Sequence, residues 1–144
     1  MTLSAWDEKY SQNQHIYGTE PNAFIKSFID KLNTGKILFP AEGEGRNAVY
    51  AAKKGWTVEA FDSSPIAVKN AINWADKNNV KINYTNEDVI FYTPKSDYFH
   101  VVAVSFLHLP RVHRRIFSVK MWESLRIGGK MIMEVFSKEQ LKFS

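Results

Sequence analysis

The segment ILFPAEGEGRNAVYAAKKGWTVEAFD, residues 37–62, predicts a strand, a glycine turn, a helix and a second strand that ends in Asp62. Gly43 and Gly45 can adopt positive φ and let a ligand approach the backbone closely. A turn that opens a helix also presents backbone N–H groups to a polar or anionic ligand. The segment therefore raises the question of which ligand such a turn holds.

The rest of the chain alternates strands with helices in the same way. Strands are expected at residues 36–41, 57–62, 81–88, 98–107 and 130–137, and helices after Ser4 and near residues 21–34, 46–54, 65–79 and 110–127. This alternation predicts an α/β fold, a three-layer, doubly wound, mostly parallel sheet of Rossmann-like type. Ligands of such sheets bind beyond the carboxyl ends of the strands.

Capping residues set the expected helix ends. Thr19 is expected to cap the first long helix, with Pro21 in its first turn and Gly35 at its end. Ser64 is expected to cap the helix that starts at residue 65, and the glycine pair 128–129 to end the last helix. These assignments follow the usual preferences for helix termini.

Length and composition limit the class of protein. The 144 residues predict one domain, residues 1–144, and the absence of cysteine excludes disulfides, cysteine nucleophiles and thiolate metal sites. No apolar run approaches the roughly 20 residues of a membrane span, and no secretory signal is visible, so a cytoplasmic protein is expected. The net charge is +4, and the densest basic stretch, RVHRR at 111–115, is read as a solvated helix face, which argues against a nucleic-acid partner.

The turn by itself leaves several ligands open. Any tight strand-to-helix turn can use glycine, and Gly43, Gly45 and Ala48 fit the dinucleotide pattern G-x-G-x-x-A. Glu42 argues against a pyrophosphate, because a carboxylate before the first glycine suits an ammonium group instead. Asp62 can accept hydrogen bonds from both hydroxyls of a ribose. An acid after the third expected strand, in the pair 87–88, can accept from the exocyclic amine of adenine, so together these residues indicate S-adenosylmethionine.

The sequence at this point resembles the class I methyltransferases, and more narrowly the tellurite-resistance and thiopurine-type enzymes that act on small molecules. The resemblance rests on AWDEKY, YGTEPNAF, AEGEGRNAVYAAKKG, VEAFDSSPIAVKNA, NEDV and LRIGGKMIMEVFSKEQ, and it covers essentially the whole chain. It implies an N-terminal lid and helix over residues 1–35 and a cofactor-binding core over 36–144. It also implies a small-molecule methyl acceptor.

The resemblance assigns a role to each motif residue. It implies that the methionine part of the cofactor is held by Glu42, Gly43 and Gly45, and the ribose by Asp62 with Ser63 beside it. It also implies that Asp88 and Val89 frame the adenine and that Ser105 and Phe106 face the sulfonium. The lid would be formed by Trp6, Tyr10 and Tyr17. Aromatic rings attract a positive sulfur through cation–π interactions, which suits Trp6, Tyr10, Tyr17 and Phe106 to this role. Core packing is the alternative role for Phe106.

Two departures from the family pattern stand out. Arg46 and Asn47 replace the usual third glycine of the turn, and Arg46 either pairs with the methionine carboxylate or is an exposed first-turn arginine. The family fold normally continues through a helix and two antiparallel strands beyond the fifth strand. Without them the fifth strand would be an apolar sheet edge, which predicts a homodimer through that edge. The alternative is a monomer whose edge is covered by the tail or the N-terminal segment.

The acceptor side gives a weaker signal. After the fourth expected strand the chain reads VSFLHLPRVHRR, where His108 is either a general base or a polar cap. The Asn/Asp-Pro-Pro-aromatic signature of enzymes that methylate nucleic-acid bases is missing there. The sequence therefore predicts methyl transfer to a small molecule, with two alternatives: a cofactor-binding truncated domain without turnover, and an NAD-binding oxidoreductase.

Overall fold

The computed structural model describes residues 18–105, 107 and 109–134. Within these residues one sheet has the strand order β3-β2-β1-β4-β5, and every neighbouring pair is parallel. The strands are β1 Lys36–Pro40, β2 Thr57–Asp62, β3 Asn83–Asn86, β4 Phe99–Ser105 and β5 Leu125–Glu134. The order reverses between β1 and β4, so the carboxyl ends of these two strands flank the switch point at which such sheets bind ligands.

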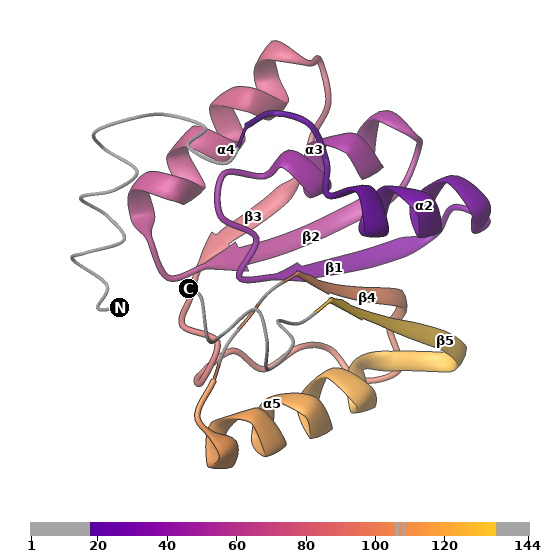
Figure 1. Cartoon of the computed structure of the whole chain (residues 1–144), viewed down its shortest axis with the longest axis vertical. Helices are drawn as coiled ribbons and strands as arrows, with labels where there is room; N and C mark the ends of the chain where they lie inside the picture. Colours follow the sequence, from indigo (N-terminus) through magenta and orange to yellow (C-terminus); the bar gives the residue numbers. More distant parts are fainter. Residues whose placement is uncertain (1–17, 106, 108, 135–144) are drawn as a thin grey trace.

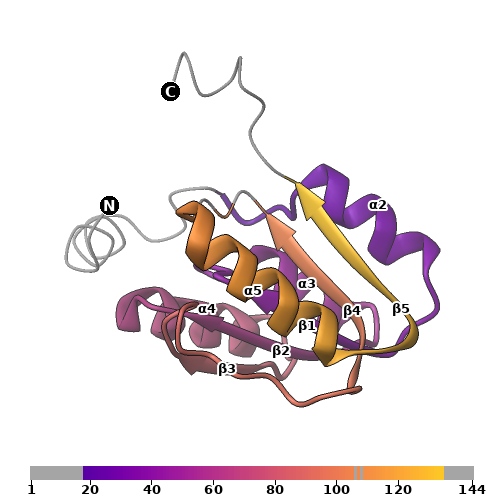
Figure 2. The same ribbon diagram turned by 90° about the horizontal axis from the view of Figure 1, so that it is seen from below.

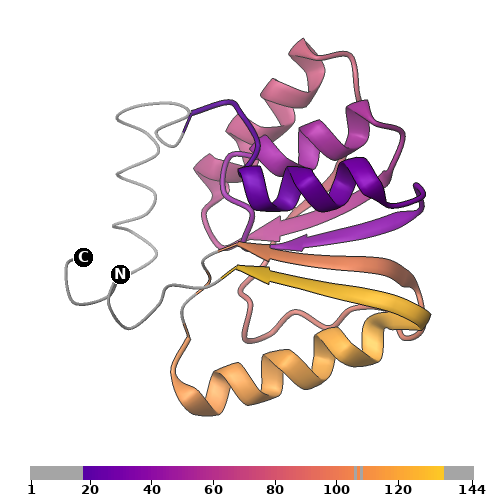
Figure 3. The same ribbon diagram turned by 45° about the vertical axis from the view of Figure 1, so that its right-hand side comes forward.

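Helices cover both faces of the sheet, which confirms the predicted three-layer α/β fold (Figure 1). On one face lie α2 Ala23–Lys31, α3 Arg46–Lys53 and α4 Pro65–Lys77, and on the other lies α5 Arg111–Ser124 (Figure 3). None of these described helices is both long and apolar enough to cross a membrane.

Each face of the sheet has its own apolar core because strand side chains alternate in direction. Ile37 and Phe39 of β1 pack with the helices α2, α3 and α4. Leu38 points to the opposite face and packs with Phe117 and Met121 of α5. Since β4 supplies residues to both cores, its nearly continuous apolar run is buried on both faces, as the sequence predicted.

The start of α2 differs from the prediction. Asn22, not Thr19, is the N-cap, and its side-chain oxygen accepts from the backbone N–H groups of Phe24 and Ile25 at 2.9 and 3.1 Å. The helix also ends at Lys31, before Gly35. Gly35 serves a packing role, because a Cβ there would lie 2.6 Å from the ring of His100.

The junction between α5 and β5 also differs from the prediction. The helix ends at Ser124 and β5 begins at Leu125, which pairs with Phe99, so residues 125–127 belong to the strand and not to the helix. The register then shifts, and the strand bends before it runs beside β4 (Figure 2). Gly129 fits this bend because a Cβ there would lie 2.8 Å from the carbonyl oxygen of Arg126.

Candidate cofactor site

The glycine turn between β1 and α3 has three left-handed residues at alternating positions. Their φ angles are 49° at Ala41, 68° at Gly43 and 84° at Gly45. The third position that favours glycine therefore precedes Gly43 and is occupied by Ala41, whereas residues 46 and 47 begin α3 with helical geometry. The structure thus adds Ala41 to the positions at which this turn adopts a left-handed conformation, and it gives Arg46 and Asn47 to the first turn of α3.

Gly43 is fixed through both of its backbone groups. Its N–H donates to Oδ2 of Asp62 at 2.9 Å, and its carbonyl oxygen accepts from the buried hydroxyl of Tyr84. Asp62 ends β2 and Tyr84 lies in β3, so the two neighbouring strands hold the turn. A ligand can therefore approach the backbone of Gly43 closely because no side chain is there, but it finds no free hydrogen-bonding group on this residue.

Glu42 faces the first turn of α3. One carboxylate oxygen accepts from the N–H of Ala48 at 2.6 Å, and the other accepts from the side-chain amide of Asn47 at 3.2 Å. Burial raises the pKa of Glu42 to about 7, although these hydrogen bonds and the charge of Arg46 oppose the shift. Because the N-cap residue Gly45 has no side chain, Glu42 performs the capping of this helix.

Glu44 is a second carboxylate of the turn that the sequence reasoning missed. It is buried and accepts from the side-chain amide of Asn70, on α4, at 2.8 Å. The next residue of the turn, Gly45, lies against the same helix, where an added Cβ would be 2.8 Å from the Cβ of Ala71. The turn is thus enclosed between α3 and α4, which only the three-dimensional packing reveals.

Asp62 lies beside the turn, as the predicted ribose role requires. Its Oδ1 accepts from the N–H of Ser64 at 2.9 Å while Oδ2 accepts from Gly43, and the residue is half-buried. A carboxylate has about four lone-pair directions, so one such group can serve several donors at once. Ser63, next in the chain, is also half-buried.

The predicted adenine residues follow β3. The N–H of Glu87 donates to the carbonyl oxygen of Asp62 at 3.0 Å, which keeps the chain after β3 beside the end of β2. Asp88 is exposed, and its carboxylate accepts from the N–H of Ile90 at 2.8 Å. Val89 is half-buried against the core on the α5 side. Asp62 and Asp88 therefore lie at the carboxyl ends of neighbouring strands.

The ends of β4 and β5 hold a polar pair of which only one member was predicted. Ser105 is half-buried and lies opposite Glu134 in the register of the two strands. The Oε2 atom of Glu134 is buried and has no hydrogen-bond partner among the described residues. The remaining predicted residues, Trp6, Tyr10, Tyr17, Phe106 and His108, lie outside the described residues.

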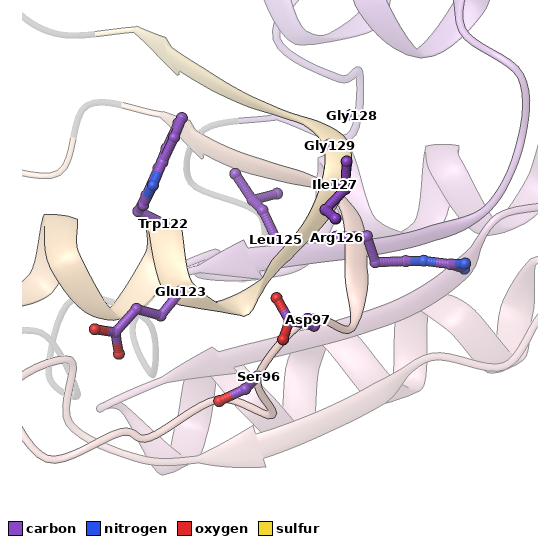
Figure 4. Close-up of a pocket in the computed structure, with 9 residues that line it drawn as sticks. All are labelled: Ser96, Asp97, Trp122, Glu123, Leu125, Arg126, Ile127, Gly128 and Gly129. Atoms are coloured by element: carbon purple, nitrogen blue, oxygen red, sulfur yellow. The ribbon is translucent and has the colours of Figure 1, made fainter.

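An open pocket lies away from this site. It is lined by Ser96, Asp97, Trp122, Glu123, Leu125, Arg126, Ile127, Gly128 and Gly129 (Figure 4). Leu125 pairs with Phe99, the first residue of β4, so the pocket is at the amino ends of the strands. The predicted site residues lie at the opposite ends of the strands, the carboxyl ends.

Comparison with protein families identifies the domain. Residues 37–129 match the family described as "Methyltransferase domain". The chain therefore belongs to the methyltransferase domain family, with the strand order and glycine turn of its class I, S-adenosylmethionine-dependent members. No curated protein sequence matches the chain.

Solved structures of low sequence identity share the fold. The PH0226 protein from Pyrococcus horikoshii OT3 matches with a TM-score of 0.74 and 19% identity, over 94% of this chain and 64% of its own. TehB from Haemophilus influenzae matches with 0.75 and 16%, over 96% and 54%. Phosphoethanolamine N-methyltransferase 1 from Haemonchus contortus, solved with phosphoethanolamine and S-adenosylhomocysteine, matches with 0.77 and 14%, over 96% and 32%. The chain thus spans between about a third and two thirds of the lengths of these three proteins.

Proposed function

We propose that this chain binds S-adenosylmethionine across the carboxyl ends of β1, β2 and β3 and transfers its methyl group to a small-molecule acceptor. The observation that carries the proposal is the Asp62 carboxylate, which is fixed 2.9 Å from the N–H of Gly43 in a turn of left-handed residues. In this proposal Asp62 accepts from the ribose hydroxyls beside the backbone of Gly43, which carries no side chain.

The residues present fit the parts of this cofactor. Asp62 would accept from the ribose hydroxyls with Ser63 beside it, and Asp88 and Val89 would frame the adenine. The methionine part would lie over Gly43 and Gly45, with Glu42 and Arg46 offering charges of opposite sign to its ammonium and carboxylate. Ser105 and Phe106 would face the sulfonium, with Trp6, Tyr10 and Tyr17 as the lid.

The cofactor, when bound, supplies an activated methyl group on a sulfonium that is already an excellent leaving group. The protein therefore contributes mainly orientation and a dry pocket. A base is needed only for an acceptor that carries a proton, and His108 is the candidate that the sequence offers for this step.

The turn itself disfavours the NAD alternative. Both Glu42 and Glu44 are carboxylates of the glycine turn, and Glu44 is buried there. A pyrophosphate at this position would face negative charge in place of the free N–H groups that it needs. Titration calorimetry with S-adenosylmethionine and with NAD tests this point, and binding of NAD alone would refute the proposal.

Turnover needs a separate experiment. Formation of S-adenosylhomocysteine should be measured over a panel of thiols, oxyanions and heterocycles. Product with at least one acceptor supports the methyltransferase, whereas tight cofactor binding without any product supports the alternative, a cofactor-binding domain without turnover.

A further inference from the structure

Asn47 connects two parts of the molecule that are far apart in sequence. It lies in the first turn of α3 and is only 3% exposed. Its side-chain amide donates to Oε1 of Glu42 at 3.2 Å, and its carbonyl Oδ1 accepts from the backbone N–H of Asn22 at 2.8 Å. Both polar ends of this buried side chain are therefore used, one toward the glycine turn and one toward α2.

The second partner, Asn22, determines where α2 begins. Its own side chain caps the helix, while its backbone N–H is held by Asn47. From there α2 extends over the sheet, and Ile25 and Ile29 enter the core that also contains residues of β1, β4 and β5. A change in the position of Glu42 can thus reach the start of α2 through a single side chain.

The chemistry of the connection requires an amide. Glu42 needs a donor and the Asn22 N–H needs an acceptor, and only a side chain with both groups satisfies them together. Alanine would leave the N–H of Asn22 without its acceptor and one oxygen of Glu42 without its donor at half-buried positions, which costs more than the bonds themselves are worth. Aspartate would keep the acceptor for Asn22 but would place a second carboxylate against Glu42.

We propose that Asn47 is a positioning residue that couples the cofactor turn to the start of α2, so that ligand binding in the turn strengthens the hydrogen bond from the Asn22 N–H and slows its exchange. The inference rests on the proposed function, because it takes S-adenosylmethionine as the ligand of the turn. Asn47 acts through Glu42 and Asn22 and does not itself need to touch the ligand.

The test is amide hydrogen exchange at Asn22 with and without S-adenosylmethionine, together with calorimetry of its binding. In the wild-type chain, binding should slow exchange at Asn22 severalfold. In Asn47→Ala, exchange should be fast in both conditions and affinity should fall by about tenfold, the equivalent of one lost buried hydrogen bond. Asn83→Ala, an exposed asparagine on β3, is the matched control and should behave as wild type.

Asn47→Asp separates the coupling from a purely structural role. It retains the acceptor for the Asn22 N–H, so exchange without ligand should stay slow, but ligand should no longer change it. Affinity should also fall more at pH 8 than at pH 6, because the two carboxylates then repel each other. This variant also serves if Asn47→Ala fails to fold.

Several results would overturn the inference. One is wild-type protein that binds S-adenosylmethionine with unchanged exchange at Asn22, and another is an Asn47→Asp variant with wild-type affinity and wild-type ligand-dependent protection. If the wild-type chain does not bind S-adenosylmethionine at all, the proposed function falls and the inference falls with it. The two failures are distinguishable, because only the first two results occur in a protein that binds the ligand.

Discussion

The two halves of the sheet differ in how many polar side chains hold their loops and in how many large apolar side chains they expose. Around β1, β2 and β3, the glycine turn is held by side chains from four elements, including Asp62, Tyr84, Asn47 and Asn70. Among the described residues, exposed large apolar side chains are more numerous around β4, α5 and β5, where they are Val112 69%, Ile116 46%, Val119 51%, Trp122 69%, Ile127 105% and Met133 40%, than elsewhere, where they are Phe24 40%, Ile72 40%, Ile90 37% and Phe91 80%. The first half resembles a preorganised binding site, and the second resembles an apolar surface that contacts another molecule or another part of the protein.

This contrast corresponds to the two ligands of a methyl transfer, the cofactor and the methyl acceptor. A cofactor shared by many enzymes needs a fixed cradle, which a few short-range turns and strand ends can build. The acceptor differs between enzymes, and the compared proteins are longer than this chain, which spans 64%, 54% and 32% of their lengths.

Two glycines with nearly the same φ angle offer the strongest test of the contrast. Gly45 has φ +84° and an added Cβ would lie 2.8 Å from Ala71, whereas Gly128 has φ +83° and nothing within 4 Å. Gly45→Val should lower the free energy of unfolding by about 4 kcal/mol, because strain and overpacking add. Gly128→Val should cost about 1–2 kcal/mol, from strain alone.

Urea denaturation measures both losses, and equal losses would mean that the turn is not the tightly packed region described above. Gly45→Val should also abolish S-adenosylmethionine binding in calorimetry if the methionine part of the cofactor lies over this glycine. Because the added side chain meets Ala71, the loss of binding should come together with the loss of stability.

The next largest effect concerns pH and the carboxylate of Glu42. Its pKa is about 7 in the folded chain and 4.5 in the unfolded chain, so between these values the folded state holds a proton that the unfolded state has lost. The contribution of Glu42 to the free energy of unfolding should therefore fall as pH rises from 4.5 to 7, by about 3 kcal/mol in total.

Glu42→Gln removes this titration. Its stability relative to wild type should be higher at pH 8 than at pH 5 when both are unfolded in urea. Glu123→Gln, which removes an exposed carboxylate of α5, corrects for the loss of one charge. A stability difference between Glu42→Gln and wild type that is the same at both pH values would contradict the prediction.

Asp62→Ala tests the proposed ribose contact. Loss of charge-assisted hydrogen bonds should weaken S-adenosylmethionine binding by about 1.5–3 kcal/mol in calorimetry. Some stability should be lost too, because the N–H groups of Gly43 and Ser64 both lose an acceptor. Asp76→Ala, on the exposed face of α4, is the control, and unchanged affinity in Asp62→Ala would place the ligand elsewhere.

The same contrast explains what the sequence could and could not predict. The fold class, the bounds of β2 and the Ser64 cap depend on neighbouring residues and were predicted correctly. The end of α5 was not, because it depends on the pairing of Leu125 with Phe99, and the glycines 128–129 were taken as the stop signal instead. Packing against a distant strand overrode a local signal.

The site shows the same limit. The placement of Asp62 beside Gly43 agrees with what the order of strand, turn and strand suggested. The sequence did not predict the hydrogen bonds of Glu44 with Asn70, of Gly43 with Tyr84 and of Asn22 with Asn47. The members of these pairs are 26, 41 and 25 residues apart along the chain, respectively. No periodicity or motif in a single sequence encodes such pairs.

The smallest expected effect concerns the edge of the sheet at β5. Within the described residues β5 is the last strand of the order β3-β2-β1-β4-β5, and Met133 near its end is 40% exposed. An edge strand with exposed apolar side chains is a template for pairing with another chain. We propose that two copies pair through β5 about a two-fold axis, which would set the two β5 strands antiparallel.

Sedimentation velocity at several protein concentrations tests this proposal. The wild-type chain should associate more strongly as concentration rises, and Met133→Lys should weaken the association by placing a charge on the edge strand, which is a common natural protection of such edges. Ile72→Lys, on α4, is the control, because Ile72 is also 40% exposed and the substitution adds the same charge far from β5. A strict monomer at high concentration would contradict the proposal and would mean that the β5 edge is covered in some other way. The two halves of the sheet would then differ only in how their side chains pack within one chain.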